Sequence, residues 1–88
     1  MKTEKIIELI MQELERAKKI HPNWPEDKIH ASAVLAEECG ELVQAANDYM
    51  YCRCNHDEKE NYERMIEEAI QCGAMAIRFL ENMENKNK

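Results

Sequence analysis

Only two glycines and two prolines occur in this chain of 88 residues, which is unusually few. A β-sheet needs many turns, and turns depend on Gly, Pro, Asn and Asp. Most other positions hold residues that favour helices, chiefly Ala, Glu, Lys, Leu, Met, Ile and Gln. The chain is therefore expected to be all-α, and collagen-like or disulfide-knotted folds are excluded.

Apolar residues recur at three- and four-residue spacing in three segments, which is typical of amphipathic helices. The helices are expected at about residues 3–20, 26–50 and 57–83. Thr3 is a candidate N-cap for the first helix, and Asn55 or Asp57 for the third. Pro25 fits the first turn of the second helix. Residues 84–88 are polar and are expected to form a tail.

The length of the chain limits it to one domain, residues 1–88, with a small core. Long helices around a thin core leave apolar surface, which a second copy is expected to cover in a homodimer or homotetramer. A net charge of −6 argues against binding a nucleic acid polymer. No apolar run approaches the roughly 20 residues of a membrane span, so no membrane partner is expected. The N-terminus lacks a signal-peptide pattern, which indicates a cytoplasmic protein with reduced cysteines.

One carboxylate lies inside an apolar arc when the third helix is projected at about 100° per residue. It is Glu68. The arc consists of Met65, Ala69, Cys72, Met75, Ala76, Phe79, Leu80 and Met83. A buried carboxylate needs a cation, hydrogen bonds or a shifted pKa. A divalent cation would satisfy Glu68, and so would an ion pair with Arg64 or Arg78 from the adjoining strip.

The second helix carries an acidic stripe, formed by Glu37, Glu41, Gln44 and Asp48. Glu38 sits at its edge, facing an apolar arc of Leu35, Leu42, Ala45 and Tyr49. Glu38 and Glu41 are three residues apart, so their carboxylates are neighbours. Such a stripe is either a solvated helix face or part of a site for a divalent cation. Ligands that are all oxygen favour Mg²⁺ or Mn²⁺ over Zn²⁺.

Three short motifs resemble those of the MazG-like all-α nucleoside triphosphate pyrophosphohydrolases. Residues 37–41 (Glu-Glu-Cys-Gly-Glu) match the family's Glu-Glu-x-x-Glu motif. Residues 68–71 (Glu-Ala-Ile-Gln) stand where its Glu-x-x-Asp motif is expected, 26 residues further on. Residues 24–27 (Trp-Pro-Glu-Asp) look like the family's entry to the first motif helix. The resemblance covers about residues 22–80.

The resemblance implies a three-helix antiparallel subunit that is completed by oligomerisation into a helical bundle. It implies a Mg²⁺-dependent hydrolase acting on acid anhydrides, which converts a ribo- or deoxyribonucleoside triphosphate to the monophosphate and pyrophosphate. The metal, Mg²⁺ or Mn²⁺, would be held by Glu38, Glu41, Glu68 and Gln71. Glu37 or Glu41 would act as the catalytic base that deprotonates water.

Gln71 departs from the family, which has Asp at this position. Its amide oxygen can ligate a metal but supplies no charge. The alternative is therefore a catalytically silent MazG-like helical module that binds a nucleotide or a protein partner. The candidates for binding substrate are Trp24, Lys28, His30, Arg64 and Arg78. Trp24 could stack on a base or plug the space between the first two helices.

Two further features concern packing and thiol chemistry. Gly40 and Gly73 lie within helices, where they could permit a close approach of another helix, for Gly73 at a subunit contact. Cys52, Cys54 and His56 are close in sequence, but their spacing fits free cysteines better than a structural zinc site.

Overall fold

The computed structural model describes residues 1–51 and 57–84. They form three helices, α1 (Thr3–Ile20), α2 (Lys28–Tyr51) and α3 (Glu58–Glu84), and no strand occurs within these two ranges. The expectation of an all-α domain with three helices is confirmed. Across the same residues, no helix combines the length and the apolar character that crossing a membrane requires.

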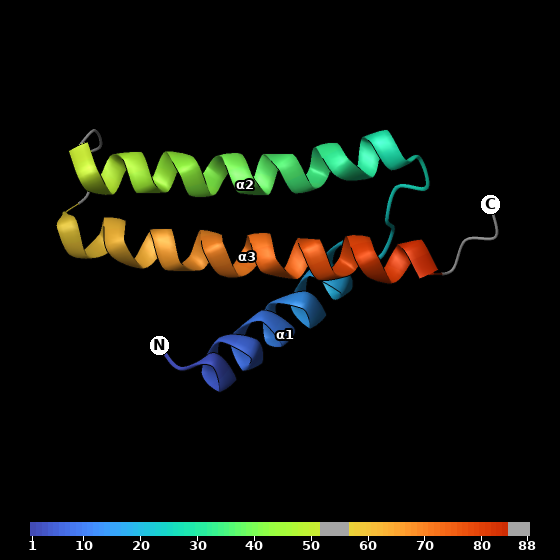
Figure 1. The fold of residues 1–88 in the computed structure, drawn as a ribbon, viewed down its shortest axis with the longest axis horizontal. Helices are drawn as coiled ribbons and strands as arrows, with labels where there is room; N and C mark the ends of the chain where they lie inside the picture. Colours follow the sequence, from blue (N-terminus) through green and yellow to red (C-terminus); the bar gives the residue numbers. More distant parts are fainter. Residues whose placement is uncertain (52–56, 85–88) are drawn as a thin grey trace.

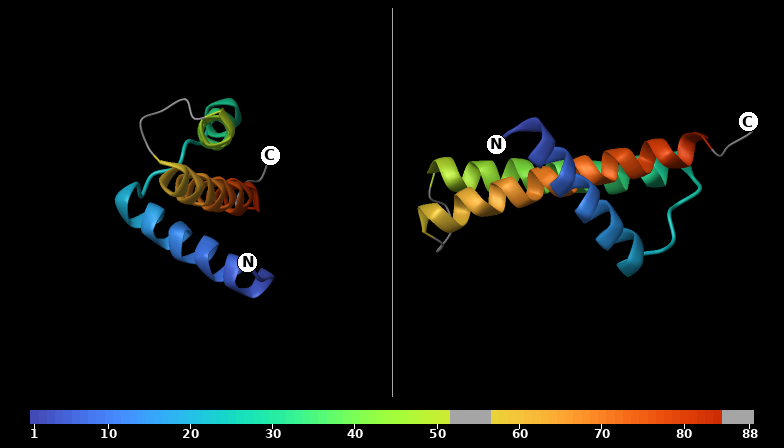
Figure 2. Two further views of the ribbon diagram at one scale, coloured as in Figure 1. Left: turned by 90° about the vertical axis from the view of Figure 1, so that its left-hand side faces the viewer. Right: turned by 90° about the horizontal axis from the view of Figure 1, so that it is seen from below.

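The three helices are stacked as α2, α3 and α1, with α3 in the middle (Figure 1). α2 and α3 run antiparallel and side by side over most of their length. α1 lies on the opposite side of α3 and crosses it obliquely (Figure 2). The expected antiparallel arrangement is therefore found for α2 and α3, whereas α1 departs from it.

Aspartate side chains fix the start of the two long helices. The Oδ2 atom of Asp27 accepts a hydrogen bond from the backbone N–H of His30 at 3.2 Å. The Oδ1 atom of Asp57 accepts one from the N–H of Glu60 at 2.8 Å. Each bond satisfies an amide that has no partner within its own helix. α2 consequently begins two residues later than expected, and Asp57, one of the two candidates for α3, is the cap.

The predicted cap of α1 is wrong. Thr3 is already the first helical residue, and the N-cap is Lys2, which makes no capping hydrogen bond through its side chain. The backbone carbonyl of Lys2 accepts from the N–H of Ile6 at 3.0 Å, so the helix starts one residue earlier than a Thr3 cap requires. Asn55, the other candidate cap of the third helix, lies outside the described residues.

The main core lies between α1 and α3. Its buried members are Leu14, Ala17, Ala74 and Met75, with Ile10, Trp24, Leu35 and Ile77 packed against them. A Cβ atom added at Gly73 would lie 3.0 Å from Cδ1 of Ile10, so Gly73 permits α1 to pass close to α3. This contact is within one chain, which corrects the expectation of a subunit contact at Gly73. Apart from its chain neighbours and its own helix backbone, no atom would lie within 4 Å of a Cβ at Gly40.

α3 is buried on two sides, whereas the sequence pattern indicated one arc. Within that arc Met75 is buried and Cys72 is half-buried, but Ala69, Leu80 and Met83 are exposed. The second buried side, facing α1, includes Ala74. On α2 the expected arc is confirmed, since Ala45 is buried and the other three members are half-buried.

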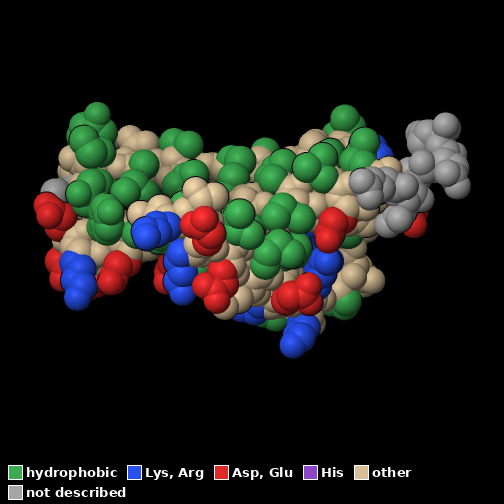
Figure 3. Space-filling model, turned by 60° about the horizontal axis from the view of Figure 1, so that its bottom comes forward, with side chains coloured by type: hydrophobic (Ala, Val, Ile, Leu, Met, Phe, Trp, Pro, Cys, Tyr) green, Lys and Arg blue, Asp and Glu red, His purple; other side chains and the backbone are tan. Residues whose placement is uncertain are grey.

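An apolar stripe on α2 remains uncovered. Its members are exposed and recur at alternating spacings of four and three residues, with a final step of seven: Ile29, Ala33, Ala36, Gly40, Val43 and Met50. We call this set the outer stripe of α2. Exposed hydrophobic side chains are not confined to α2, and on the face drawn in Figure 3 they extend along most of the molecule.

Candidate functional site

Three carboxylates meet where α2 and α3 pack together. Glu38 and Glu41 come from α2 and Glu68 from α3, and one oxygen atom of each lies within 4.8 Å of the others. The spacing of three residues puts Glu38 and Glu41 on one helix face. The antiparallel pairing of the helices brings Glu68 opposite them. The structure thus unites three of the four predicted metal ligands, which we call the acidic cluster.

Two oxygen atoms of the acidic cluster are buried without a hydrogen bond. They are Oε2 of Glu38 and Oε1 of Glu68. Burial raises the pKa of Glu38, and the charges of Glu41 and Glu68 raise it further. Burial, followed by the charge of Glu41, also raises the pKa of Glu68. A buried polar atom without a partner is costly, and three like charges add to that cost.

A hard divalent cation fits this arrangement. Carboxylate oxygens are the ligands preferred by Mg²⁺ and Mn²⁺, and a cation would provide the partner that the two buried oxygens lack. It would also turn the repulsion among Glu38, Glu41 and Glu68 into attraction. The chemistry of the donor set therefore suits the metal that the sequence predicts.

Arg64, a predicted partner of Glu68, forms an ion pair with Asp48 instead. Its Nη1 atom donates to Oδ2 of Asp48 at 2.8 Å, and Nε2 of Gln44 donates to Oδ1 of Asp48 at 3.0 Å. Asp48 is only 6% exposed and Arg64 is half-buried, so this end of the predicted acidic stripe is a partly buried ion pair rather than a solvated face. The positive charge of Arg64 still lowers the pKa of Glu68, but burial and Glu41 outweigh it.

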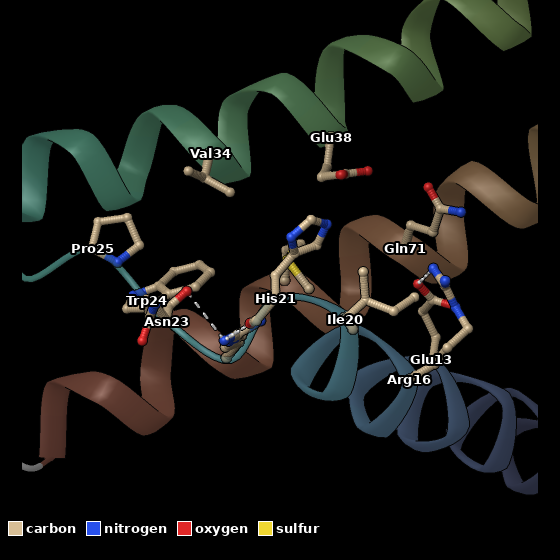
Figure 4. A pocket seen from close by; sticks show the side chains of 13 residues that line it. Glu13, Arg16, Ile20, His21, Asn23, Trp24, Pro25, Val34, Glu38 and Gln71 are labelled. Carbon is tan, nitrogen blue, oxygen red and sulfur yellow. Dashed lines mark hydrogen bonds and ion pairs between the residues drawn. The ribbon is translucent and has the colours of Figure 1, made fainter.

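A cavity of about 430 Å³ adjoins the acidic cluster and lies between the end of α1, the segment that follows it, α2 and α3 (Figure 4). Glu38 belongs to both the cavity and the cluster. The cavity is lined by Glu13, Arg16, Ala17, Ile20, His21, Asn23, Trp24, Pro25, Val34, Glu38, Gln71, Met75 and Arg78. Its volume falls in the range of small-molecule sites, and it combines apolar walls with a few polar groups.

Arg78 holds the segment between α1 and α2 in place. It is 4% exposed, and its Nη2 atom donates to the backbone carbonyls of His21 at 2.5 Å and Asn23 at 3.4 Å. Its guanidinium carbon lies 5.1 Å from the centre of the Trp24 ring, a cation–π contact. Trp24 also packs against the core of α1 and α3, so it has a packing role, although not as a plug between the first two helices, and it still lines the cavity.

The other predicted site residues are spread around this centre. Gln71 is half-buried and lines the cavity together with Glu38. Glu37 is exposed and stands outside the acidic cluster. Lys28 and His30 lie near the start of α2 and are not among the residues that line the cavity.

Sequence reasoning missed Arg16 and Glu13. Two hydrogen bonds join them, from Nε of Arg16 to Oε1 of Glu13 at 2.9 Å and from Nη2 to Oε2 at 2.6 Å. Both residues line the cavity, and Arg16 lies close to Gln71 in Figure 4. The spacing of three residues signals an ion pair on a helix, but it carries no information about which other helix the pair faces.

Two cysteines also face each other beside the acidic cluster. The Sγ atoms of Cys39 on α2 and Cys72 on α3 are 2.9 Å apart. The hydrogen bond with Cys39 and burial raise the pKa of Cys72 to about 11, with further contributions from the charges of Cys39 and Glu38. The other cysteines singled out in the sequence, Cys52 and Cys54, lie outside the described residues, as does His56.

The chain was compared with models of protein families, with curated proteins and with solved structures, and none of the three comparisons found a match.

Proposed function

We propose that this protein is a MazG-like, Mg²⁺-dependent nucleoside triphosphate pyrophosphohydrolase. The observation that carries the proposal is the acidic cluster, in which Glu38 and Glu68 each bury an oxygen atom that has no hydrogen-bond partner. Burying such atoms among apolar groups costs free energy unless a ligand provides the partner that they lack. Perturbed carboxylates beside a cavity are typical of functional sites.

The three carboxylates differ in exposure, and this suggests different roles. Glu38 and Glu68 are half-buried and would act as the inner metal ligands. Glu41 is exposed and would share the metal while deprotonating the attacking water. Glu41 suits the role of base better than Glu37, which stands outside the acidic cluster. Bound Mg²⁺ would neutralise the phosphates and polarise the phosphorus that is attacked.

The cavity would hold the nucleoside end of the substrate. Its apolar wall includes Ile20, Val34 and the ring of Trp24, which suits the face of a base. Arg16 is exposed and could contact a phosphate oxygen without breaking a buried interaction. Arg78 is not available for this role, because it is buried and already bonds two backbone carbonyls.

Calorimetric titration with Mg²⁺ and Mn²⁺ tests the metal site, and pyrophosphate release from a panel of nucleoside triphosphates tests the reaction. Glu68→Gln should abolish both signals while the protein remains helical. Glu63→Gln is the matched control, because Glu63 lies on the same helix, is exposed and is not part of the acidic cluster. The enzyme proposal fails if the folded wild-type protein binds neither ion and releases no pyrophosphate.

The second candidate is a silent helical module that binds a nucleotide or a protein partner. Gln71 favours it, since this residue lines the cavity beside Glu38 but adds no charge where the family has Asp. Gln71→Asp distinguishes the two proposals. If this variant binds Mg²⁺ and the wild type does not, the module is the better description.

We also propose that the protein works as a homo-oligomer, with a homodimer as its basic unit. The outer stripe of α2 is apolar, and its small residues Ala33, Ala36 and Gly40 would let a second helix approach closely. Alternating spacings of three and four residues are typical of a helix seam. The proposed cytoplasmic location stays a prediction from the sequence.

A further inference from the structure

The thiols of Cys39 and Cys72 form a pair that the proposed reaction does not use. They lie on different helices and are 33 positions apart in the chain, yet their sulfur atoms are 2.9 Å apart. Cys39 is exposed and Cys72 is half-buried. A disulfide bond is about 2.05 Å long, so the sulfur atoms would have to approach by less than about 1 Å.

We infer that Cys39 and Cys72 form a reversible intramolecular disulfide, with a low-molecular-weight disulfide such as oxidised glutathione as the oxidant. The inference rests on the geometry of the pair and is independent of the proposed hydrolase activity. Cys39 is the residue that an oxidant reaches first, because it is the exposed member. Cys72 is then within reach of the same sulfur atom.

The chemistry proceeds by two exchange steps. In the first, the sulfur of Cys39 attacks one sulfur of the oxidant, which forms a mixed disulfide and releases one small thiol. In the second, the sulfur of Cys72 attacks Sγ of Cys39, which forms the protein disulfide and releases the second small thiol. Together the protein thiols lose two protons and two electrons, and the S–S bond of the oxidant is reduced to two thiols.

The bond would join α2 and α3 at the acidic cluster. Cys39 follows Glu38 directly, and Cys72 is one helical turn after Glu68. In the metal-free protein the repulsion among the carboxylates acts to separate these helices at this point. A covalent link would oppose that separation. It would also restrict the unfolded chain by closing a loop between residues 33 positions apart.

The test uses a Cys52→Ser, Cys54→Ser variant, so that Cys39 and Cys72 are the remaining thiols. The variant is equilibrated with reduced and oxidised glutathione, quenched with acid and analysed by mass spectrometry. The expected product is monomeric, has lost two hydrogen atoms and carries no glutathione. Trypsin should release peptides 29–53 and 65–78 joined by one disulfide.

The folded structure should favour this bond. We expect its equilibrium constant against glutathione to fall by roughly a hundredfold or more in denaturing urea, because unfolding separates the two thiols. Oxidation should raise the Tm by more than about 10 °C, and dithiothreitol should reverse the shift. Cys39→Ser and Cys72→Ser, each added to the same background, should show no such shift.

Three results with the serine variant would overturn the inference. They are a stable glutathione adduct on both cysteines, a disulfide that forms only between two chains, and an equilibrium constant that urea leaves unchanged. Peptide mapping of the oxidised wild-type chain gives an independent check should the serine variant fail to fold. There, a bond from Cys72 to Cys52 or Cys54 in place of Cys39 would contradict the inference.

Discussion

The carboxylates of Glu38 and Glu68 converge from neighbouring helices, and each buries one oxygen atom that has no hydrogen-bond partner. Both residues have a raised pKa in the folded protein, with burial as the largest cause. Without a cation, the two charges therefore weaken the fold that brings them together.

The stability of the metal-free protein should decrease as the pH rises. Glu38 and Glu68 bind protons more tightly in the folded chain than in the unfolded chain, where each carboxyl has its ordinary pKa of 4.5. Their favourable contribution is complete below pH 4.5 and is lost as the pH rises through the raised pKa values. Urea unfolding, followed by circular dichroism from pH 4.5 to 8, measures the slope. A double Glu38→Gln, Glu68→Gln variant should have a flatter profile, and an equal slope in both proteins would refute this explanation.

Glu68→Gln should separate metal binding from stability. Removing a charge that lacks a partner should raise the free energy of unfolding of the metal-free protein by about 1 kcal/mol. If the wild type binds Mg²⁺ as proposed, the same change should eliminate the extra stability that saturating Mg²⁺ provides. Thermal unfolding with Mg²⁺ and with a chelator measures both effects. A loss of stability under both conditions would mean that Glu68 has a purely structural role.

Arg64→Met should destabilise the fold by about 2 to 3 kcal/mol, because it removes the charged hydrogen bond that Arg64 donates at 2.8 Å to the buried carboxylate of Asp48. It should also raise the pKa of Glu68 further, since the charge of Arg64 lowers it. Arg16→Met is the control for the loss of a surface ion pair, and its effect on stability should be much smaller. Equal losses in urea unfolding would contradict the importance assigned to burial.

The two glycines should respond oppositely to alanine. Gly40→Ala should stabilise the monomer by up to about 1 kcal/mol, because alanine favours helix and the new Cβ meets no atom within 4 Å. Gly73→Ala should gain less or lose stability, because its Cβ would press on Ile10 at 3.0 Å. Urea unfolding of both variants at low protein concentration measures the difference.

If the outer stripe of α2 is the dimer contact, Gly40→Ala should weaken the dimer while it stabilises the monomer. Val43→Glu, a charge placed on the same stripe, should abolish the dimer. Sedimentation velocity over a range of concentrations measures both effects. The proposal of a dimer through this stripe is wrong if Val43→Glu leaves a dimer intact.

Periodicity along one helix was enough to predict the elements and one half of the site. The three helices, the inward position of Glu68 and the choice of Asp57 as one of two candidate caps all depend on local spacing. A carboxylate inside an apolar arc is a strong signal, because burial without a partner is costly wherever the arc packs.

Relationships between helices could not be predicted in the same way. The meeting of Cys39 and Cys72 depends on the register between α2 and α3, and the contact of Gly73 with Ile10 depends on the crossing of α1. Asp48 belongs to the same stripe as Glu41, yet only the position of Arg64 makes it part of a partly buried ion pair. A single helix does not contain this information.

Because α3 lies between α1 and α2, the cavity and the acidic cluster depend on different pairs of helices. Within the described residues, α1 packs mainly on α3, and its backbone does not come close to that of α2. If α1 swings away, the cavity loses one wall, but α2 and α3 still hold Glu38, Glu41 and Glu68 together. Local opening of α1 would therefore disrupt the cavity and leave the acidic cluster assembled. Amides of α1 should exchange with solvent at a lower free energy than those buried between α2 and α3.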